Sequence, residues 1–193
     1  YKLETDDFDT LYMRIKAMLD EVDVIITTGG VSVGDYDLLP KIYDALGAEV
    51  LFNKVAMRPG SVTTVSALDD KLLFGLSGNP SACYSGFELF TRPALNLMQE
   101  AALPFAPFVD AVLDEDFTKA NPFTRFIRAE LFFKAGKIYA RPSGFNKSNA
   151  VTSIAKSNGV IVLPGGTRGF ESGDAVKVML TDVTTGTDSF GVE

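Results

Sequence analysis

Two apolar segments in the first half of the chain each lead into a turn of small residues and then toward a helix. The first segment, 23–28, ends in Gly29-Gly30, and the second, 71–76, ends in Ser77-Gly78-Asn79-Pro80. Buried strands followed by helices are typical of layered α/β domains. In such sheets ligands bind at the carboxyl ends of the strands. The pattern therefore predicts an α/β domain whose two turns share one ligand-binding edge.

The other elements of the first half follow from hydrophobic spacing and from turn residues. Helical periodicity predicts an amphipathic helix over 6–22 and a second helix over 38–46. After the second helix, three strands are predicted, over 48–57, 62–67 and 71–76, and the last of them is the second apolar segment. Turns at 58–60 and 69–70 separate these strands. A long helix is expected from Asn79-Pro80 onward, with Asn as its cap and a kink at Pro93.

The pattern changes from helical to strand spacing around the linker-like segment 103–107. Beyond it, strands are predicted over 109–116, 124–134, 137–142, 159–163 and 175–180, with one short helix over 148–157. Five strands in so short a segment favour a small β-barrel or sandwich. We therefore expect an α/β domain over 1–103, an all-β domain over 107–182 and a flexible tail over 183–193. Residues 1–3 resemble the end of a strand that has lost its beginning, so a piece of a longer protein is expected.

Composition excludes several classes of site. The chain has one cysteine and no histidine, which excludes a disulfide framework, a Ser-His-Asp triad and a histidine-ligated metal. A general base must then be a carboxylate or a lysine. The net charge of −7 disfavours nucleic acid as a partner, and no apolar run approaches the roughly 20 residues of a membrane span. The acidic excess lies in residues 1–100.

The glycine-rich segment Thr27–Asp37 has the composition of an anion-binding turn. Glycines let successive backbone N–H groups converge on a phosphate, and a helix N-terminus adds its dipole. The segment is neither a Walker loop nor a GxGxxG turn, and a plain strand-to-helix turn capped by Asp37 is an equal alternative. The second turn, 77–81, strengthens the anion-binding interpretation because both turns should lie at one edge.

Charged residues around the turns suggest further roles, each with a simpler alternative. Lys54 and Arg58 should share one strand face beside a Pro-Gly turn, either as placed cations or as a solvated hairpin end. Asp35 and Asp37 could hold a Mg²⁺ that bridges phosphate oxygens, or serve only as a solvated side chain and a helix cap. Cys83 is expected to be a buried apolar residue rather than a nucleophile. The basic residues between 125 and 147 favour a solvated strand face over a binding patch.

Three segments together, TTGGVSVGDYD, KVAMRPG and GLSGNPSACYSGFELF, resemble the molybdenum-inserting enzymes of molybdenum-cofactor biosynthesis, bacterial MoeA and the gephyrin E domain. The second half agrees, because RFIR, the stretch from Ser148 to Gly159 and VIVLP resemble that family's C-terminal β domain. The resemblance covers roughly 1–181. It implies a three-layer α/β/α sandwich of the molybdopterin-binding type, followed by a small barrel-like β domain.

The resemblance implies a reaction and a role for each matching residue. The reaction is metal-dependent transfer of molybdate into adenylated molybdopterin with release of AMP. The catalytic residues implied are Asp37, Lys54 and Arg58, and the implied Mg²⁺ ligands are Asp37 and Asp35. The implied substrate-binding residues are Thr28, Gly29, Gly30, Ser32, Gly34, Ser77, Gly78, Asn79, Pro80, Ser81 and Arg128. The family usually has a second lysine after the Pro-Gly turn, where this chain has Ser61, which leaves Lys54 and Arg58 to bind the oxyanion.

The resemblance also implies a cytoplasmic enzyme that is a homodimer at full length and whose partners are adenylated molybdopterin and molybdate. The present chain would contain its last two domains, able to bind but not to turn over substrate alone. Two alternatives stay open. A related molybdopterin adenylyltransferase is disfavoured by VSVGDYD and by the attached β domain, and a non-catalytic scaffold would need a peptide groove that the sequence does not identify.

Overall fold

The computed structural model describes residues 7–29, 38–118, 121–143, 154–181 and 190. The chain divides into two compact units, the first comprising 1–55 with 60–86 and the second comprising 56–59 with 87–193. Each unit has its own sheet and its own apolar core. None of the helices in the described residues is long and apolar enough to span a membrane.

The first unit contains a four-stranded sheet with the strand order β1-β5-β4-β2. Its elements are α1 (Phe8–Leu19), β1 (Val24–Thr28), α2 (Leu38–Ala45), β2 (Glu49–Phe52), β4 (Thr64–Leu68), β5 (Lys71–Leu76) and α3 (Pro80–Gly86). β1 runs parallel to β5, whereas β4 is antiparallel to both of its neighbours. α1 begins where the Asp7 carboxylate accepts the Thr10 N–H at 2.8 Å.

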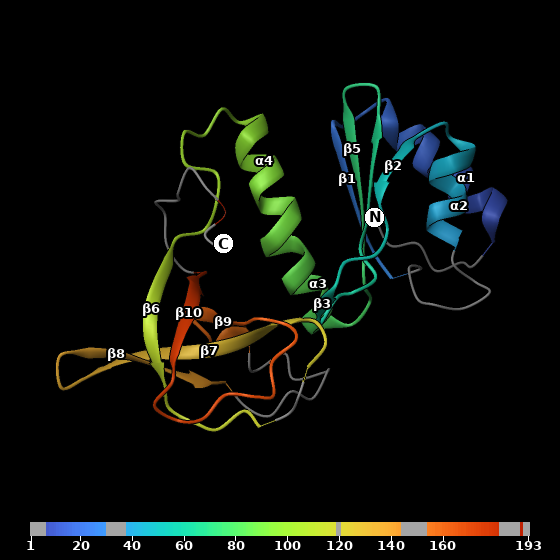
Figure 1. Ribbon diagram of the computed structural model, residues 1–193. Helices are drawn as coiled ribbons and strands as arrows, with labels where there is room; N and C mark the ends of the chain where they lie inside the picture. Colours follow the sequence, from blue (N-terminus) through green and yellow to red (C-terminus); the bar gives the residue numbers. More distant parts are fainter. Residues whose placement is uncertain (1–6, 30–37, 119–120, 144–153, 182–189, 191–193) are drawn as a thin grey trace. The chain divides into compact units, whose positions relative to one another are not determined.

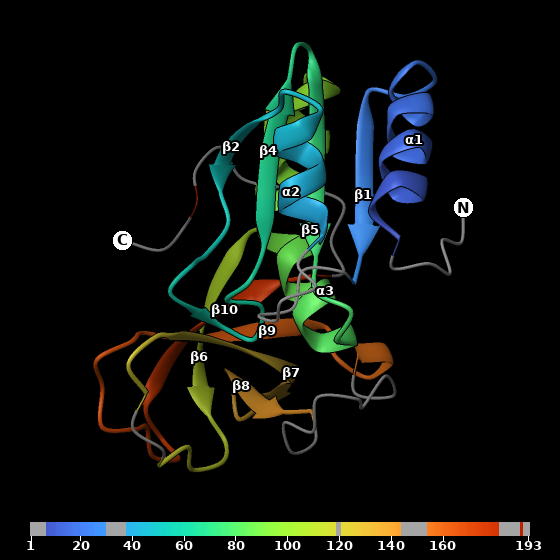
Figure 2. The same ribbon diagram turned by 90° about the vertical axis from the view of Figure 1, so that its right-hand side faces the viewer.

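Helices cover both faces of this sheet, as the predicted three-layer sandwich requires. α1 and α2 lie on one face (Figures 1 and 2). Their apolar stripes bury a core with the strand residues of that face, and its members are Leu11, Ile15, Leu19, Ile25, Leu39, Ile42, Tyr43, Ala48 and Leu73. Gly86 of α3 lies against Leu76 on the opposite face. Because β1 and β5 are parallel, their carboxyl ends lie at the same edge of the sheet, between the two helix layers.

The predicted continuous strand over 48–57 is wrong. The chain leaves the first sheet after Phe52, and only Met57–Arg58 (β3) is extended again, now in the sheet of the second unit. The Val55 N–H donates to the Ser61 carbonyl at 2.9 Å, and this hydrogen bond joins the two ends of the loop that contains β3. Lys54 and Arg58 consequently do not share a strand face, because they belong to different units.

The long helix predicted from Asn79 is present and is interrupted before Pro93. α3 is followed by a π-helical turn, η1 (Phe87–Thr91), and by α4 (Arg92–Met98). Pro93 occupies the first turn of α4, where its missing N–H is tolerated. A proline further along a regular α-helix would leave a carbonyl of the preceding turn without its donor, so the wider π turn accommodates it.

The second unit is a closed five-stranded barrel with the short strand β3 added. Its strands are β6 (Phe108–Leu113), β7 (Thr124–Lys134), β8 (Lys137–Pro142), β9 (Gly159–Leu163) and β10 (Ala175–Leu180). The order β7-β8-β6-β10-β9 closes because β9 also pairs with β7. Figure 1 shows the β7–β8 hairpin extending beyond the other strands. The barrel core consists of Ala111, Leu113, Ile127, Ala129, Ala140, Ile161, Leu163, Val176 and Val178.

All five strands predicted for this half are present, four of them with the predicted bounds, and only β6 differs. Most of the predicted helix over 148–157 lies outside the described residues, and so does most of the predicted tail. Phe190 is described. Its ring makes edge contacts with Phe105 and Phe108, at centroid distances of 5.8 and 6.4 Å.

Candidate ligand-binding site

The two small-residue turns of the first unit are in contact. Thr28 of β1 is paired with Leu76 of β5, and the Gly29 N–H donates to the Leu76 carbonyl at 2.9 Å. A Cβ atom on Gly78 would lie 3.3 Å from the Gly29 Cα, so the two turns pack backbone against backbone. Gly29 has a φ of +88°, a conformation open to glycine at little cost. The predicted shared edge is therefore formed by the residues Thr28, Gly29 and Ser77–Ser81.

Asn79 organises the second turn as the cap of α3. Its side-chain oxygen accepts the N–H groups of Ser81 and Ala82, at 3.0 and 3.3 Å. The Asn79 N–H donates in turn to the Ser77 hydroxyl at 3.2 Å. Pro80 follows at the first helical position, where no N–H is needed. The turn is thus held by its own side chains.

Beneath the first turn, a buried hydrogen bond joins the two elements that flank the glycine segment. The hydroxyl groups of Thr27 and Tyr43 are 3.1 Å apart, and Thr27 also donates to the Phe74 carbonyl at 3.2 Å. The Tyr43 side chain has no exposed surface. Burial raises the pKa of Tyr43 to about 12, and the hydrogen bond with Thr27 acts in the opposite direction. The end of β1 and the helix α2 are therefore fixed to one another.

Part of the predicted site lies outside the described residues. This applies to Gly30, Ser32 and Gly34 and to the two carboxylates proposed as Mg²⁺ ligands, Asp35 and Asp37. The described residues contain no group of three or more His, Cys, Asp or Glu side chains that could hold a metal ion. The roles predicted for residues 30–37 stay predictions.

The three predicted cationic residues have different surroundings. Lys54 is exposed, in irregular chain after β2 of the first unit. Arg58 is exposed on β3 of the second unit, and its guanidinium lies over the Phe123 ring at 5.6 Å. Arg128, by contrast, is only 8% exposed, on β7. The structure thus gives a solvent-facing side chain to Lys54 and Arg58 and a buried one to Arg128.

Sequence reasoning missed Arg125, which it assigned to a solvated strand face. In the structure Arg125 is directly paired with Arg58 across the parallel β3–β7 contact. Its guanidinium lies 5.0 Å from the centre of the Phe117 ring. Desolvation, and then the positive charge of Arg58, lower the pKa of Arg125. A local pattern could not reveal this pair, because the two arginines are far apart in the sequence.

Cys83 fits the expected apolar role. It lies in the helix α3, its side chain is partly buried, and burial raises the pKa of the thiol. A reactive cysteine needs a lowered thiol pKa, so the surroundings of Cys83 do not favour nucleophilic chemistry.

Comparison with known families accounts for both halves of the chain. Residues 1–97 match a family model described as "Probable molybdopterin binding domain". Residues 110–181 match the "MoeA C-terminal region (domain IV)". The two matches occur in the order that the sequence resemblance predicted.

Curated relatives and solved structures agree with these matches. The chain is 57% identical over 182 residues to a molybdopterin molybdenumtransferase of Staphylococcus aureus (strain COL), covering 94% of this chain and 43% of the relative. It is 55% identical over 184 residues to the molybdopterin molybdenumtransferase of Bacillus subtilis (strain 168), covering 95% of this chain and 43% of that protein. The chain therefore spans less than half the length of these relatives.

Among solved structures, a molybdopterin biosynthesis moeA protein from Pyrococcus horikosii matches with a TM-score of 0.75 and 26% identity, covering 91% of this chain and 41% of that one. A molybdenum cofactor biosynthesis protein from Pyrococcus furiosus matches with a TM-score of 0.70 and 24% identity, covering 94% of this chain and 57% of that one. Because its identity is only 24%, the match to the Pyrococcus furiosus protein is evidence for the fold alone.

Proposed function

The chain belongs to the MoeA family of molybdopterin-binding proteins, and on this basis we propose that it is the molybdopterin-binding and C-terminal part of a molybdopterin molybdenumtransferase. The proposed reaction consumes adenylated molybdopterin and molybdate and yields the molybdenum cofactor and AMP. The observation that carries the proposal is the backbone contact of Gly29 with Gly78 at the carboxyl edge of β1 and β5.

This edge has the chemistry that a phosphorylated ligand requires. The first unit contains most of the acidic excess of the chain, so side-chain charge alone does not attract an anion there. The dipole of a helix N-terminus and the close backbone approach that glycine turns permit can do so at short range. The N–H groups of Gly29, Asn79, Ser81 and Ala82 already donate within the turns, so these groups are not the donors on which the assignment depends. We assign the binding of the phosphate and nucleotide parts of the substrate to Thr28–Gly29 and to the turn Ser77–Ser81.

The other assignments follow the family resemblance. Lys54 and Arg58 would bind molybdate or the pyrophosphate, and Arg128 would contribute to substrate binding. A Mg²⁺ ion held by Asp37 and Asp35 would neutralise phosphate oxygens. The roles given to the two turns do not depend on that ion. At full length the enzyme would act as a homodimer.

Neither of the two alternative functions, an adenylyltransferase or a scaffold, is as well supported as the transferase. The match of 110–181 to the MoeA C-terminal region favours the transferase, since the sequence ties this β domain to the molybdenum-inserting enzymes. A scaffold function in place of catalysis has no supporting feature among the described residues.

The substitution Gly78→Ala tests the proposal. The Cβ of the new alanine would lie 3.3 Å from the Gly29 Cα. This contact is tight, and a backbone atom cannot relieve it by rotating as a side chain could. We expect adenylated molybdopterin to bind at least tenfold more weakly, with little change in melting temperature because Gly78 is exposed. Isothermal titration calorimetry measures the affinity.

The matched control is Gly136→Asn in the β7–β8 turn, where φ is +75° and nothing lies within 4 Å of an added Cβ. Asn tolerates this conformation better than most residues. The control should leave ligand affinity unchanged. Unchanged affinity in Gly78→Ala would remove the two turns from the binding site and with them the main support for the proposed function.

A further inference from the structure

The β7–β8 hairpin of the second unit has an apolar side chain at its end that the other described residues leave uncovered. Phe133 of β7 is 84% exposed, the highest value among the large apolar side chains that the structure describes. Because side chains alternate along a strand, Phe133 lies on the same face as Leu131, which packs against the barrel core. Its register partner Ile138 packs against that core as well. The apolar face of the barrel therefore continues to an exposed phenylalanine.

Single exposed apolar residues are common at protein surfaces, but the strand edge beside Phe133 is open as well. β9 pairs with β7 only as far as Gly159, which is opposite Ala129. At the next position along this edge the Asn158 side chain replaces a strand. Its oxygen accepts the Leu131 N–H at 2.7 Å, and its amide nitrogen donates to the Leu131 carbonyl at 3.3 Å.

The backbone groups of Phe133 point to the same side of β7 as those of Leu131, because the direction of these groups alternates along a strand. In the described part of the chain, no residue forms a hydrogen bond with them on that side. The edge of β7 thus binds an amide group at Leu131 and is open at Phe133.

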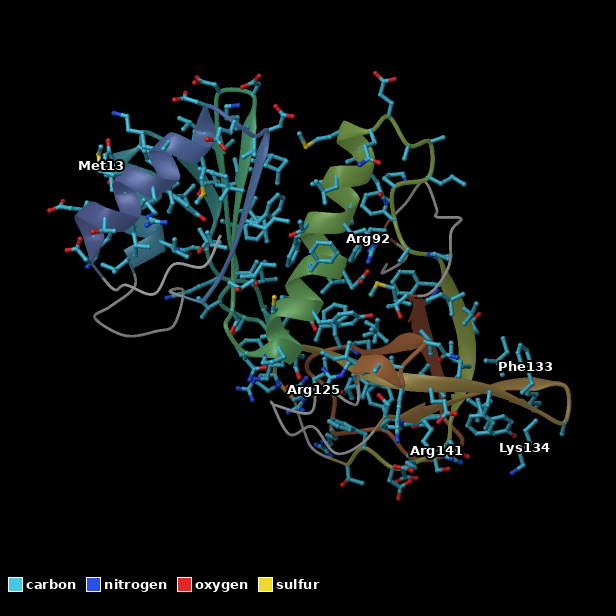
Figure 3. All side chains as sticks on the ribbon, turned by 180° about the vertical axis from the view of Figure 1, so that it is seen from behind. Met13, Arg92, Arg125, Phe133, Lys134 and Arg141 are labelled. Carbon is cyan, nitrogen blue, oxygen red and sulfur yellow. The ribbon has the colours of Figure 1, made fainter. Side chains whose placement is uncertain are left out.

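Two lysines lie at the end of the hairpin, on the face opposite Phe133. Lys134 and Lys137 are register partners, and both are exposed. Neither takes part in an ion pair among the described residues. The Lys134 ammonium lies 5.8 Å from the centre of the Tyr139 ring, and Figure 3 shows Phe133 and Lys134 on opposite sides of the hairpin. Because directly opposed like charges repel, an acidic neighbour would stabilise this pair.

Lysines at an open edge also protect a protein from pairing with a second copy of itself. Such pairing would bring the lysines of both hairpins together, so charge disfavours a second copy as the partner. Protection alone does not account for Phe133, because an exposed aromatic side chain at an open edge favours association. An acidic strand would satisfy the lysines, the backbone groups and the apolar side chain together.

We propose that the edge of β7 at Phe133 is a docking site for an extended acidic segment of a partner protein, which adds to the hairpin as an antiparallel strand. The partner residue opposite Phe133 places its side chain on the apolar face, and the residues before and after it place theirs on the face of Lys134 and Lys137. The partner segment therefore has an acidic–apolar–acidic pattern. This site is separate from the turns assigned to ligand binding, and its role is additional to the proposed reaction.

The test is fluorescence anisotropy of the full chain with a fluorescein-labelled peptide of alternating glutamate and valine, EVEVEVE. We expect binding that weakens as ionic strength rises. Phe133→Ser and Lys134→Glu should each weaken it at least tenfold and keep the wild-type melting temperature, because both side chains are exposed. The matched control is Met13→Ser, which changes another exposed apolar side chain, 63% exposed on α1, and should bind as the wild type does. The cationic peptide KVKVKVK should not bind.

Methylation of the peptide backbone separates strand addition from a loose apolar contact. In the proposed register the valine N–H groups face β7, so N-methylation of the three valines should abolish binding. N-methylation of the two interior glutamates should have little effect.

The proposal is overturned if the wild type does not bind EVEVEVE, or if Phe133→Ser and Lys134→Glu bind it within twofold of the wild type. Binding of phosphatidylserine vesicles without binding of the peptide would assign the hairpin to a membrane surface instead. A dimer in sedimentation that Phe133→Ser abolishes, again without peptide binding, would assign it to a second copy. The contact tested by Gly78→Ala lies in the other unit, so each of these results leaves that test of the proposed function intact.

Discussion

At the scale of single residues, the buried Tyr43 predicts a pH dependence of stability. Burial raises the pKa of Tyr43 to about 12 from its ordinary value of 10. A phenol is neutral when protonated, so the folded state holds the proton more tightly than the unfolded state does. The resulting stability is complete below about pH 10 and is lost as the pH rises through the folded-state pKa of about 12.

We therefore expect the free energy of unfolding of the wild type to fall between pH 10 and 12 more steeply than that of Tyr43→Phe. The shift of two pKa units corresponds to a difference on the order of 2–3 kcal/mol. At neutral pH, Tyr43→Phe should cost about 1 kcal/mol for its hydrogen bond with Thr27. Urea unfolding across this pH range measures both effects, and parallel pH profiles would mean that Tyr43 does not titrate with unfolding.

A second residue-scale prediction separates two roles of Asp37. As a helix cap, Asp37 could be replaced by Asn at little cost. As a ligand of Mg²⁺, it must be charged, and its loss would remove several kcal/mol of transition-state stabilisation. We expect Asp37→Asn in the full-length enzyme to keep its melting temperature and to lose molybdenum insertion. Wild-type turnover with an unchanged metal requirement would show that Asp37 is only a cap.

At the scale of secondary-structure elements, the N-terminus of α3 caps a helix and is also the proposed ligand-binding turn, and the two roles can be separated. Asn79 caps two N–H groups of the helix, so Asn79→Ala should lower the free energy of unfolding by about 1 kcal/mol. Asn79→Asp retains the cap oxygen and should keep the melting temperature. Its negative charge would repel a phosphate at the same turn, so ligand affinity should fall in a stable protein. Thermal melts and calorimetry on the same samples check this, and full affinity in Asn79→Asp would place the phosphate elsewhere.

The elements that sequence predicted well are those that local signals specify. β8 has the predicted bounds because the turn Ala135-Gly136 precedes a short alternating segment, and α3 begins as predicted because Asn79 and Pro80 are local start signals. The prediction of one strand over 48–57 was wrong because the two ends of this segment pair in different sheets, and a local sequence pattern does not indicate such pairing. The contact of the two turns followed from strand order, whereas the Arg58–Arg125 pair depends on β3 joining a distant strand.

At the scale of the whole molecule, two separate cores predict two separable unfolding units. Ile15 is fully buried in the core of the first unit, and Ile15→Ala should cost about 2–5 kcal/mol there. In the second unit, a Cβ on Gly159 would lie 2.8 Å from Val178 and 3.0 Å from Leu131. Gly159→Ala should therefore cost roughly 1–3 kcal/mol through overpacking of the barrel.

Hydrogen exchange followed by mass spectrometry can locate these losses, because exchange of protected amides reports the free energy of opening of each unit. We expect Ile15→Ala to accelerate exchange in peptides from α1 and β5 and to leave β7 and β9 unchanged. Gly159→Ala should do the reverse. Each substitution disturbs side chains whose neighbours belong to one core only. Equal acceleration of both sets of peptides by either variant would show that the two units unfold as one.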